Sequence, residues 1–157
     1  MGIRFDNTYD QLPAPFFERV APSAALSPRL VVLNRELGRR LGLQLDGASA
    51  EDLAELLSGQ KLLPGSGTIA MAYSGHQFGH FAGVLGDGRA ILLGEVLAGD
   101  GSRWDIHLKG AGQTPFSRRG DGRCALGPAL REYLVSEYLA RVGIPSTRSL
   151  AVVLTGE

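Results

Sequence analysis

The sequence predicts an α+β fold in which a small antiparallel sheet carries one long helix and follows an N-terminal helical arm. Residues 103–109 alternate polar and apolar side chains, as a half-buried strand does, and residues 126–142 repeat apolar side chains at helical steps. From residue 64 onward, glycines recur between short apolar runs, which is typical of short strands joined by tight turns.

We expect two regions that form one structural unit: an arm with helices at 1–63 and a glycine-rich lobe at 64–157. Prolines scattered over 5–29 indicate an extended segment that lies on a surface. Apolar residues at helical spacing predict a helix over 30–41, with Gly42 as its stop. Another helix is expected where Ser49 and Asp52 resemble a capping box, and it should reach about Leu57.

Turn chemistry organises the glycine-rich lobe. Gly86-Asp87-Gly88-Arg89 lies between apolar runs, and an Asp-Gly pair in that setting predicts a hairpin turn. A second turn at 99–102 leads into the strand 103–109, so we expect three short antiparallel strands. The long helix should end at Gly143-Ile144-Pro145, and the apolar run 150–154 predicts a further strand.

Composition restricts the function. The 157 residues are 44% hydrophobic, which fits one domain with a real core. Sixteen basic and sixteen acidic residues cancel, so no broad positive surface for nucleic acid or an anionic membrane is expected. Any binding of phosphate must therefore be local.

The absence of targeting signals predicts a cytoplasmic protein. No apolar run approaches the roughly 20 residues of a spanning helix, and the first residues lack the apolar core of a secretory signal. Cys124 is the only cysteine, which excludes a disulfide within the chain and a zinc site of several cysteines. We expect Cys124 to be a small packed side chain.

Lys109 ends the alternating run, and Glu132 follows on the helical stretch 23 positions later (132 − 109). A strand lysine with a helix glutamate is how a kinase-type small lobe holds nucleotide phosphates. The glutamate fixes the direction of a lysine that would otherwise be flexible. The alternative is that Lys109 is a solvated strand end and Glu132 an ordinary surface residue of a helix.

Two glycine-arginine turns flank the lysine. Arg89 and Arg123 each follow an Asp-Gly pair, and a guanidinium beside permissive glycines can donate a planar fork to a phosphate. Turns of this kind also occur for purely structural reasons. The two turns together favour a phosphate site more than either turn alone.

The histidines do not predict a metal site. His76 and His80 are four positions apart, but flanking glycines argue against a helix and no third ligand is evident. His107 alternates with apolar residues and is expected to be a packed or exposed strand residue.

Several long motifs resemble the selenoprotein O family, and the resemblance runs from Phe5-Asp6-Asn7 to Thr155-Gly156-Glu157. The motifs that carry it are Tyr73-Ser74-Gly75-His76-Gln77-Phe78-Gly79, Leu85-Gly86-Asp87-Gly88-Arg89-Ala90, Leu108-Lys109-Gly110-Ala111-Gly112-Gln113-Thr114-Pro115-Phe116-Ser117-Arg118 and Gly120-Asp121-Gly122-Arg123. Motifs of this length are far more specific than a single glycine loop.

The resemblance implies a protein-kinase-like small lobe with antiparallel strands, an αC-type helix and an N-terminal helical extension. It implies a protein adenylyltransferase that binds ATP in a flipped orientation and transfers AMP, or UMP from UTP, to Ser, Thr or Tyr hydroxyls of bacterial protein substrates. Glu132 matches the helix glutamate that supports Lys109. The matching ATP-binding residues are Gly86, Gly88, Arg89, Lys109, Asp121 and Gly122.

The resemblance also implies parts that do not lie within residues 1–157. These are further phosphate-binding arginines, a catalytic aspartate, and the asparagine and aspartate that hold Mg²⁺ or Mn²⁺. We therefore expect a lobe that is incomplete at its C-terminus, with no catalytic or metal-binding residue of its own. The alternatives are a non-catalytic nucleotide-binding pseudokinase fragment and a small structural α+β protein. The family's redox cysteine or selenocysteine lies near the C-terminus of the long protein, so Cys124 is not that residue.

Overall fold

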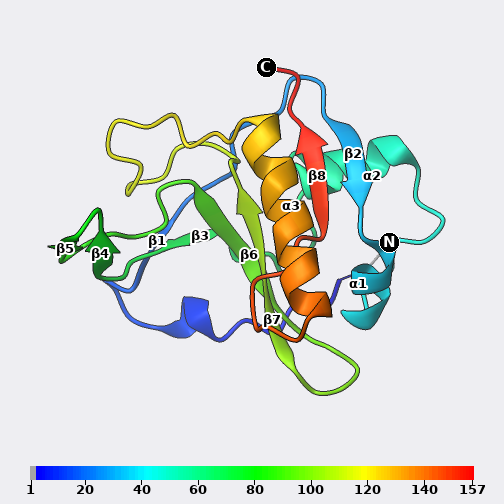
Figure 1. Ribbon diagram of the computed structural model, residues 1–157, viewed down its shortest axis with the longest axis horizontal. Coiled ribbons are helices and arrows are strands. Elements are labelled where there is room, and N and C mark those ends of the chain that lie inside the picture. The colour runs from blue at the N-terminus through cyan, green and yellow to red at the C-terminus, as the bar shows by residue number, and fades with distance from the viewer. Residues whose placement is uncertain (1–2) are drawn as a thin grey trace.

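The computed structural model describes residues 3–157, and over these residues it is a mixed α and β fold with antiparallel sheets (Figure 1). Its main sheet has the strand order β1-β3-β6-β7, while β2 pairs with β8 and β4 pairs with β5. The elements are η1 (Tyr9–Gln11), β1 (Phe17–Arg19), β2 (Arg29–Leu33), α1 (Arg35–Arg40), α2 (Ala50–Leu57), β3 (Ile69–Met71), β4 (Gly75–Gln77), β5 (His80–Ala82), β6 (Ala90–Leu97), β7 (Arg103–Lys109), α3 (Leu126–Arg141) and β8 (Ala151–Leu154). The prediction of an α+β fold is confirmed at this level.

The β6–β7 hairpin forms one half of the main sheet, with β6 inside and β7 at the edge. Its register places Ala90 opposite Lys109, and the turn is closed by a hydrogen bond from the Ala98 N–H to the Ser102 carbonyl at 2.8 Å. The turn predicted at 99–102 and the strand predicted at 103–109 are therefore both confirmed. Since Lys109 is the last residue of β7, the hairpin places it directly beside the segment that precedes β6.

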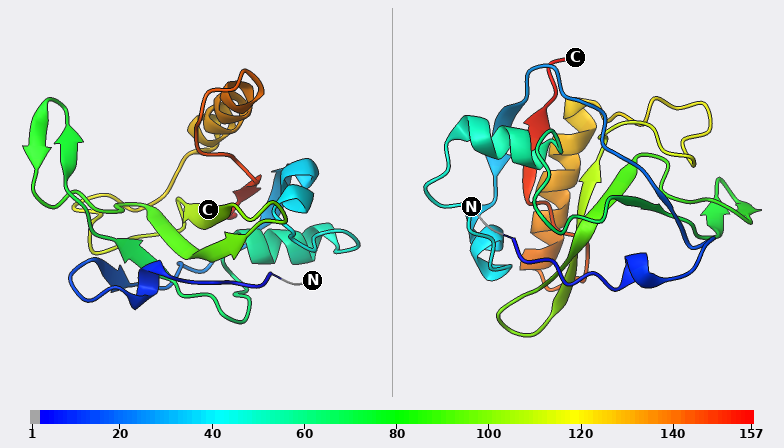
Figure 2. Two further views of the ribbon diagram at one scale, coloured as in Figure 1. Left: turned by 90° about the horizontal axis from the view of Figure 1, so that it is seen from below. Right: turned by 180° about the vertical axis from the view of Figure 1, so that it is seen from behind.

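Two of the three predicted helices are confirmed. Ser49 caps α2 by accepting a hydrogen bond from the Asp52 N–H at 3.0 Å, as the capping-box pattern predicts. Helix α3 ends at Arg141, and Gly143 follows with φ +79°, a left-handed conformation that stops a helix. Helix α3 lies on one side of the main sheet (Figure 2).

The helix predicted over 30–41 is wrong in its first half. Residues Arg29–Leu33 form β2, which pairs antiparallel with β8, and only Arg35–Arg40 is helical. Asn34 separates the two elements because its side-chain oxygen accepts from the Leu37 N–H at 3.0 Å and so begins α1. The β-branched pair Val31-Val32 fits a strand once β8 is available as a partner.

The hairpin turn predicted at Gly86-Asp87-Gly88-Arg89 is also wrong. The chain reverses instead between β4 and β5, and residues 83–89 return as an irregular segment beside the end of β3. The buried Asp87 carboxylate accepts from the Met71 N–H at 3.1 Å and from the Tyr73 hydroxyl at 3.0 Å. The aspartate therefore ties this segment to β3 and does not shape a two-residue turn.

The N-terminal arm supplies β1 to the main sheet and β2 to the two-stranded sheet with β8. The extended segment expected at 5–29 is interrupted by η1 and by β1, which pairs with β3 at the edge of the main sheet. One hydrophobic cluster joins leucines of α1 and α2 to Val96 of β6, and a second gathers around Ile91 and Leu108. None of the helices among residues 3–157 has the length and apolar character needed to cross a membrane.

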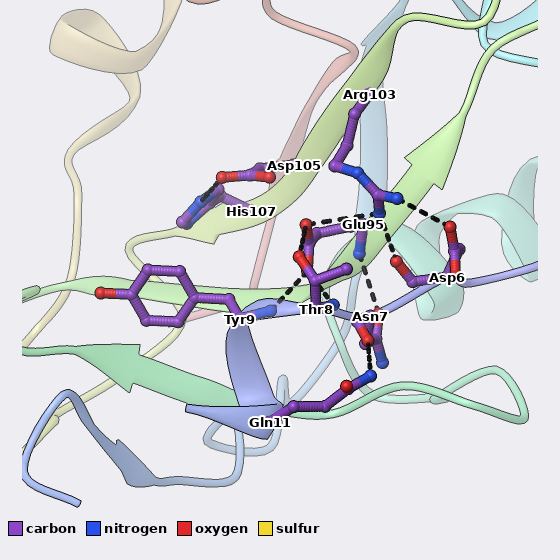
Figure 3. A network of polar contacts seen from close by, with 9 residues as sticks. All are labelled: Asp6, Asn7, Thr8, Tyr9, Gln11, Glu95, Arg103, Asp105 and His107. Carbon is purple, nitrogen blue, oxygen red and sulfur yellow. Dashed lines mark hydrogen bonds and ion pairs between the residues drawn. The ribbon is translucent and has the colours of Figure 1, made fainter. Parts of the chain in front are cut away.

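A buried carboxylate in β6 anchors the arm (Figure 3). Glu95, only 4% exposed, accepts hydrogen bonds from the backbone N–H groups of Thr8 and Tyr9 and from the Thr8 hydroxyl. Arg103 lies 3.5 Å from Glu95 and also bonds Asp6. Burial by itself raises the pKa of Glu95, but the N–H donors of Tyr9 and Thr8 and the nearby Arg103 outweigh it and hold the pKa below its ordinary value.

Replacement of this carboxylate should destabilise the fold. Glu95→Gln presents an amide N–H₂ to donors that need an acceptor, and should lower the free energy of unfolding by about 3 kcal/mol. The matched control is Asp46→Asn, because Asp46 pairs with Arg35 and Arg39 at 3.5 Å but is 66% exposed. The control should cost less than about 1 kcal/mol in urea denaturation. Equal effects would show that the Glu95 network contributes little.

Acid should weaken the fold through the same group. A carboxyl whose pKa is lower in the folded state contributes stability that is complete above its ordinary pKa of 4.5 and is lost as pH falls through the lowered value. The melting temperature should therefore stay level above about pH 5.5 and decline below about pH 4.5. Melting curves of Glu95→Gln should show a shallower decline, and an unchanged slope would contradict the assignment.

Candidate functional site

A cleft of about 560 Å³ opens between the segment before β6 and the loop 110–123, and residues of the β4–β5 hairpin also line it. Its volume lies within the range of small-molecule sites. Its walls combine glycines, arginines and apolar side chains, and the lining residues are Gln77, Phe78, Leu85, Gly86, Gly88, Arg89, Phe116, Ser117, Arg118, Gly120, Asp121, Gly122 and Arg123.

Both predicted glycine-arginine segments face this cleft. Gly86, Gly88 and Arg89 line one wall, and Asp121 and Gly122 line the other, so the structure brings together residues about 30 positions apart. Lys109 is not among the lining residues. It lies next to this wall, because the Gly110 N–H donates to the Arg89 carbonyl at 2.7 Å.

Side-chain hydroxyls fasten the two walls to each other. The Thr114 hydroxyl donates to the Asp87 carbonyl at 2.5 Å, and the Ser117 hydroxyl donates to the Gly88 carbonyl at 2.6 Å. Thr114 and Ser117 also bond one another through a tight turn, in which Pro115 occupies the favoured second position. Hydrogen bonds within the protein therefore fix the position of one wall relative to the other.

Packing within the protein is enough to explain why positions 86 and 122 are glycines. Gly86 has φ +61°, and the Phe116 ring occupies the space that a Cβ would need. Gly122 has φ +70°, and the backbone of Gly112 lies against it. Both positions require glycine in the protein alone, so their presence does not by itself indicate a phosphate.

The arginines of the cleft differ in their surroundings. Within residues 3–157, neither Arg89 nor Arg118 forms an ion pair. Arg123 pairs with Glu157, and its backbone N–H donates to the Asp121 carboxylate at 2.8 Å. Arg89 and Arg118 are thus the cations available to an anionic ligand.

Lys109 and Glu132 form a bidentate ion pair. The Lys109 Nζ lies 2.8 Å from both carboxylate oxygens of Glu132, and the two side chains are 47% and 46% exposed. A pair with this exposure contributes little to stability because water screens it. Its geometry does fix the direction of the ammonium group at the end of β7.

A second ion pair holds the helix that carries Glu132. Arg148 donates to both carboxylate oxygens of Glu137 at 2.6 Å, and the Asn34 amide donates to Glu137 at 2.7 Å. These hydrogen bonds, with the charge of Arg148, lower the pKa of Glu137 despite its burial. Helix α3 is thereby joined to the segment before β8 and to the start of α1.

The buried Asp87 affects its neighbour Tyr73. Burial, together with the charge of Asp87 and the hydrogen bond to it, raises the pKa of Tyr73 to about 12. The tyrosine therefore stays protonated and donates to the carboxylate, which again indicates a structural role for Asp87.

The carboxylates and histidines of residues 3–157 do not assemble a metal site. No group of three or more His, Cys, Asp or Glu side chains in this range is placed to hold an ion. His76 packs edge-on against Phe81, with ring centres 5.4 Å apart, and His107 lies 3.7 Å from Asp105. In the cleft, Asp121 supplies the carboxylate, and it already accepts the Arg123 N–H.

Several lining residues carry no role in the sequence interpretation: Gln77, Phe78, Leu85, Phe116, Ser117 and Arg118. The Thr-Pro-x-Ser order at 114–117 is a turn signal that could have identified Thr114 and Ser117 as loop-forming residues. No local pattern indicates that Phe78 and Arg118 reach the same cleft.

The family model for protein adenylyltransferase SelO matches residues 1–157, which is the whole chain. The chain belongs to the SelO family. This confirms the resemblance to selenoprotein O that its motifs carry.

Curated relatives in the SelO family bear the name protein nucleotidyltransferase YdiU. Those of Rhodopseudomonas palustris strains BisB5 and HaA2 are 63% and 61% identical over 153 residues, and that of Bradyrhizobium sp. strain ORS 278 is 60% identical. In each case the match covers 98% of this chain and 31% of the relative. The chain thus spans about a third of the length of these SelO-family relatives.

The hydroxyl contacts between the walls can be tested by stability. Thr114→Val removes the donor to the buried Asp87 carbonyl with little change of shape, and should lower the free energy of unfolding by about 1–3 kcal/mol. Thr147→Val, at an exposed position, should change it by less than about 0.5 kcal/mol. Urea denaturation of both variants measures the difference. Similar values for the two would argue against the fastening role of Thr114.

Proposed function

We propose that this chain forms the nucleotide-binding part of a protein nucleotidyltransferase that transfers AMP from ATP, or UMP from UTP, to Ser, Thr or Tyr hydroxyls of proteins. The observation that carries the proposal is the convergence of two glycine-arginine segments on one cleft beside the Lys109–Glu132 pair. Membership of the SelO family supports the reaction class.

Electrostatics supports a phosphate ligand. Arg89 and Arg118 face the cleft without an ion-pair partner among the described residues, although the chain as a whole is neutral. We assign Arg89 and Lys109 to the phosphates, with Gly86 and Gly88 allowing the backbone to approach them. Asp121 and Gly122 are assigned to the ribose or base end of the nucleotide.

The Lys109–Glu132 pair supports a kinase-like small lobe. In this proposal β6 and β7 correspond to two strands of the lobe's sheet and α3 to its αC-type helix, since β7 ends at the lysine and α3 carries the glutamate. Glu132 does not touch the nucleotide. It positions Lys109 so that the ammonium group meets the phosphates in a fixed direction.

The proposed reaction places the nucleotide in a flipped orientation, with its α-phosphorus toward the acceptor. The acceptor hydroxyl oxygen bonds to the α-phosphorus, the bond to the β-phosphate's bridging oxygen breaks, and pyrophosphate leaves with that electron pair. Arg89 and Lys109 stabilise the charge that develops on the leaving group. The base that takes the hydroxyl proton and the ligands for Mg²⁺ or Mn²⁺ are assigned to residues beyond 157.

A non-catalytic nucleotide-binding module is the second candidate. It is favoured by the lack of a cluster of metal ligands within residues 3–157. Such a module would bind ATP but leave acceptor proteins unlabelled, whereas a purely structural α+β protein would not be stabilised by nucleotide at all.

Lys109 tests the proposal directly. In the full-length protein, Lys109→Ala should weaken ATP binding about tenfold or more and lower AMP labelling, because a charge-assisted bond to phosphate is lost. Lys61→Ala is the control, since Lys61 is another half-exposed lysine, placed 4.0 Å from Asp52 and outside the cleft lining. Calorimetry and transfer of label from α-labelled ATP give the two readouts. Undiminished binding and labelling in Lys109→Ala would refute the assignment.

A further inference from the structure

The β4–β5 hairpin presents an aromatic ring to the cleft. The hairpin, residues 75–82, extends away from the main sheet (Figure 2), and the chain reverses at Phe78-Gly79. Phe78 lines the cleft, yet it is 92% exposed, so the rest of the described chain leaves its ring uncovered. Burial among residues 3–157 therefore does not explain this phenylalanine.

The backbone of Phe78 points to a specific placement. Its φ is +53° and that of Gly79 is +80°, the two positive values that a two-residue hairpin turn of type I′ requires. The conformation holds the ring at the hairpin tip, where it lines the same cleft as the arginines.

A hydrogen bond joins the hairpin to the opposite wall. Arg118 donates to the Gln77 side-chain oxygen at 2.8 Å, and Arg118 also has a left-handed backbone, with φ +56°. The bond connects the residue next to Phe78 with the loop 110–123. The hairpin tip that carries Phe78 is therefore linked to the loop that carries Arg118 without any ligand.

We propose that Phe78 is a nucleotide-positioning residue whose ring stacks on the base while Arg89 and Lys109 hold the phosphates. This inference rests on the proposed function and adds the part of the site that recognises the base. A nucleotide combines an anionic chain with a flat uncharged ring system, and the cleft offers a matching surface for each. Stacking accepts any base, since every base has a π face, so Phe78 serves ATP and UTP alike.

The same hairpin provides a matched control. Phe81 is also exposed, at 63%, but its ring packs edge-on against His76 and does not line the cleft. Phe81→Ala therefore removes an equally large exposed ring from the hairpin without touching the proposed stacking surface.

The test compares the binding of two ligands to the full-length protein at a fixed magnesium concentration. The ligands are ATP and inorganic tripolyphosphate, which has the phosphates but no base. By calorimetry, Phe78→Ala should bind ATP about tenfold more weakly and bind tripolyphosphate as the wild type does. Phe78→Tyr should keep most of the ATP affinity, and Phe81→Ala should match the wild type with both ligands.

Each other outcome overturns the inference in a different way. Wild-type affinity for ATP in Phe78→Ala, with or without reduced labelling of acceptor proteins, would refute stacking and leave the proposed function standing. Equal weakening of both ligands would mean that Phe78 acts through the shape of the cleft. A wild-type chain that binds neither ligand would overturn the proposed function together with the inference.

Discussion

The bidentate ion pair between Glu137 and Arg148 is the interaction on which the geometry of the candidate site depends. Within the described chain Ser136 is the buried residue of α3, so apolar packing holds this helix only weakly. Glu137 compensates by accepting from Arg148 and Asn34, which fixes α3 against the segment before β8 and the start of α1. Glu132 lies five positions away on the same helix, so its reach to Lys109 follows from this anchor. The half-exposed Lys109–Glu132 pair is too weak to place the helix by itself.

Hydrogen bonds within the protein also set the geometry of the cleft walls, and they do not involve the Arg89 side chain. Thr114 and Ser117 fasten the loop 110–123 to the segment before β6, and Phe116 fills the space beside Gly86. The glycines, which first suggested phosphate binding, are thus required by packing. The arginines are not required in this way: Arg89 and Arg118 have no carboxylate partner among residues 3–157, although Arg118 donates to the Gln77 side chain. The chemistry of the site therefore depends on its cations more than on its glycines.

Local signals predicted the elements that need no distant partner. Strand β7 and helix α3 follow from periodicity, and α2 from its capping residue. The two wrong predictions, the helix over 30–34 and the turn at 86–89, concern segments whose structure depends on contacts with another part of the chain. Val31-Val32 joins β8, more than a hundred residues away, and Asp87 turns its carboxylate to Met71 and Tyr73. In the same way, the sequence identified Arg89 and Asp121 as site candidates but missed Phe78, since its place in the cleft depends on how the hairpin and the loop 110–123 meet.

The geometry of the ion pair bears on how Lys109 could serve a nucleotide while remaining bound to Glu132. A lysine ammonium group has three N–H donors, and the two contacts at 2.8 Å to Glu132 use two of them. One donor is left for a phosphate oxygen, so the nucleotide need not displace the glutamate. Because both side chains are about half exposed, a ligand can reach the ammonium group from solvent without a rearrangement of the protein. A buried pair would have held the lysine more firmly at the cost of that access, and so partial exposure suits a positioning role for Glu132.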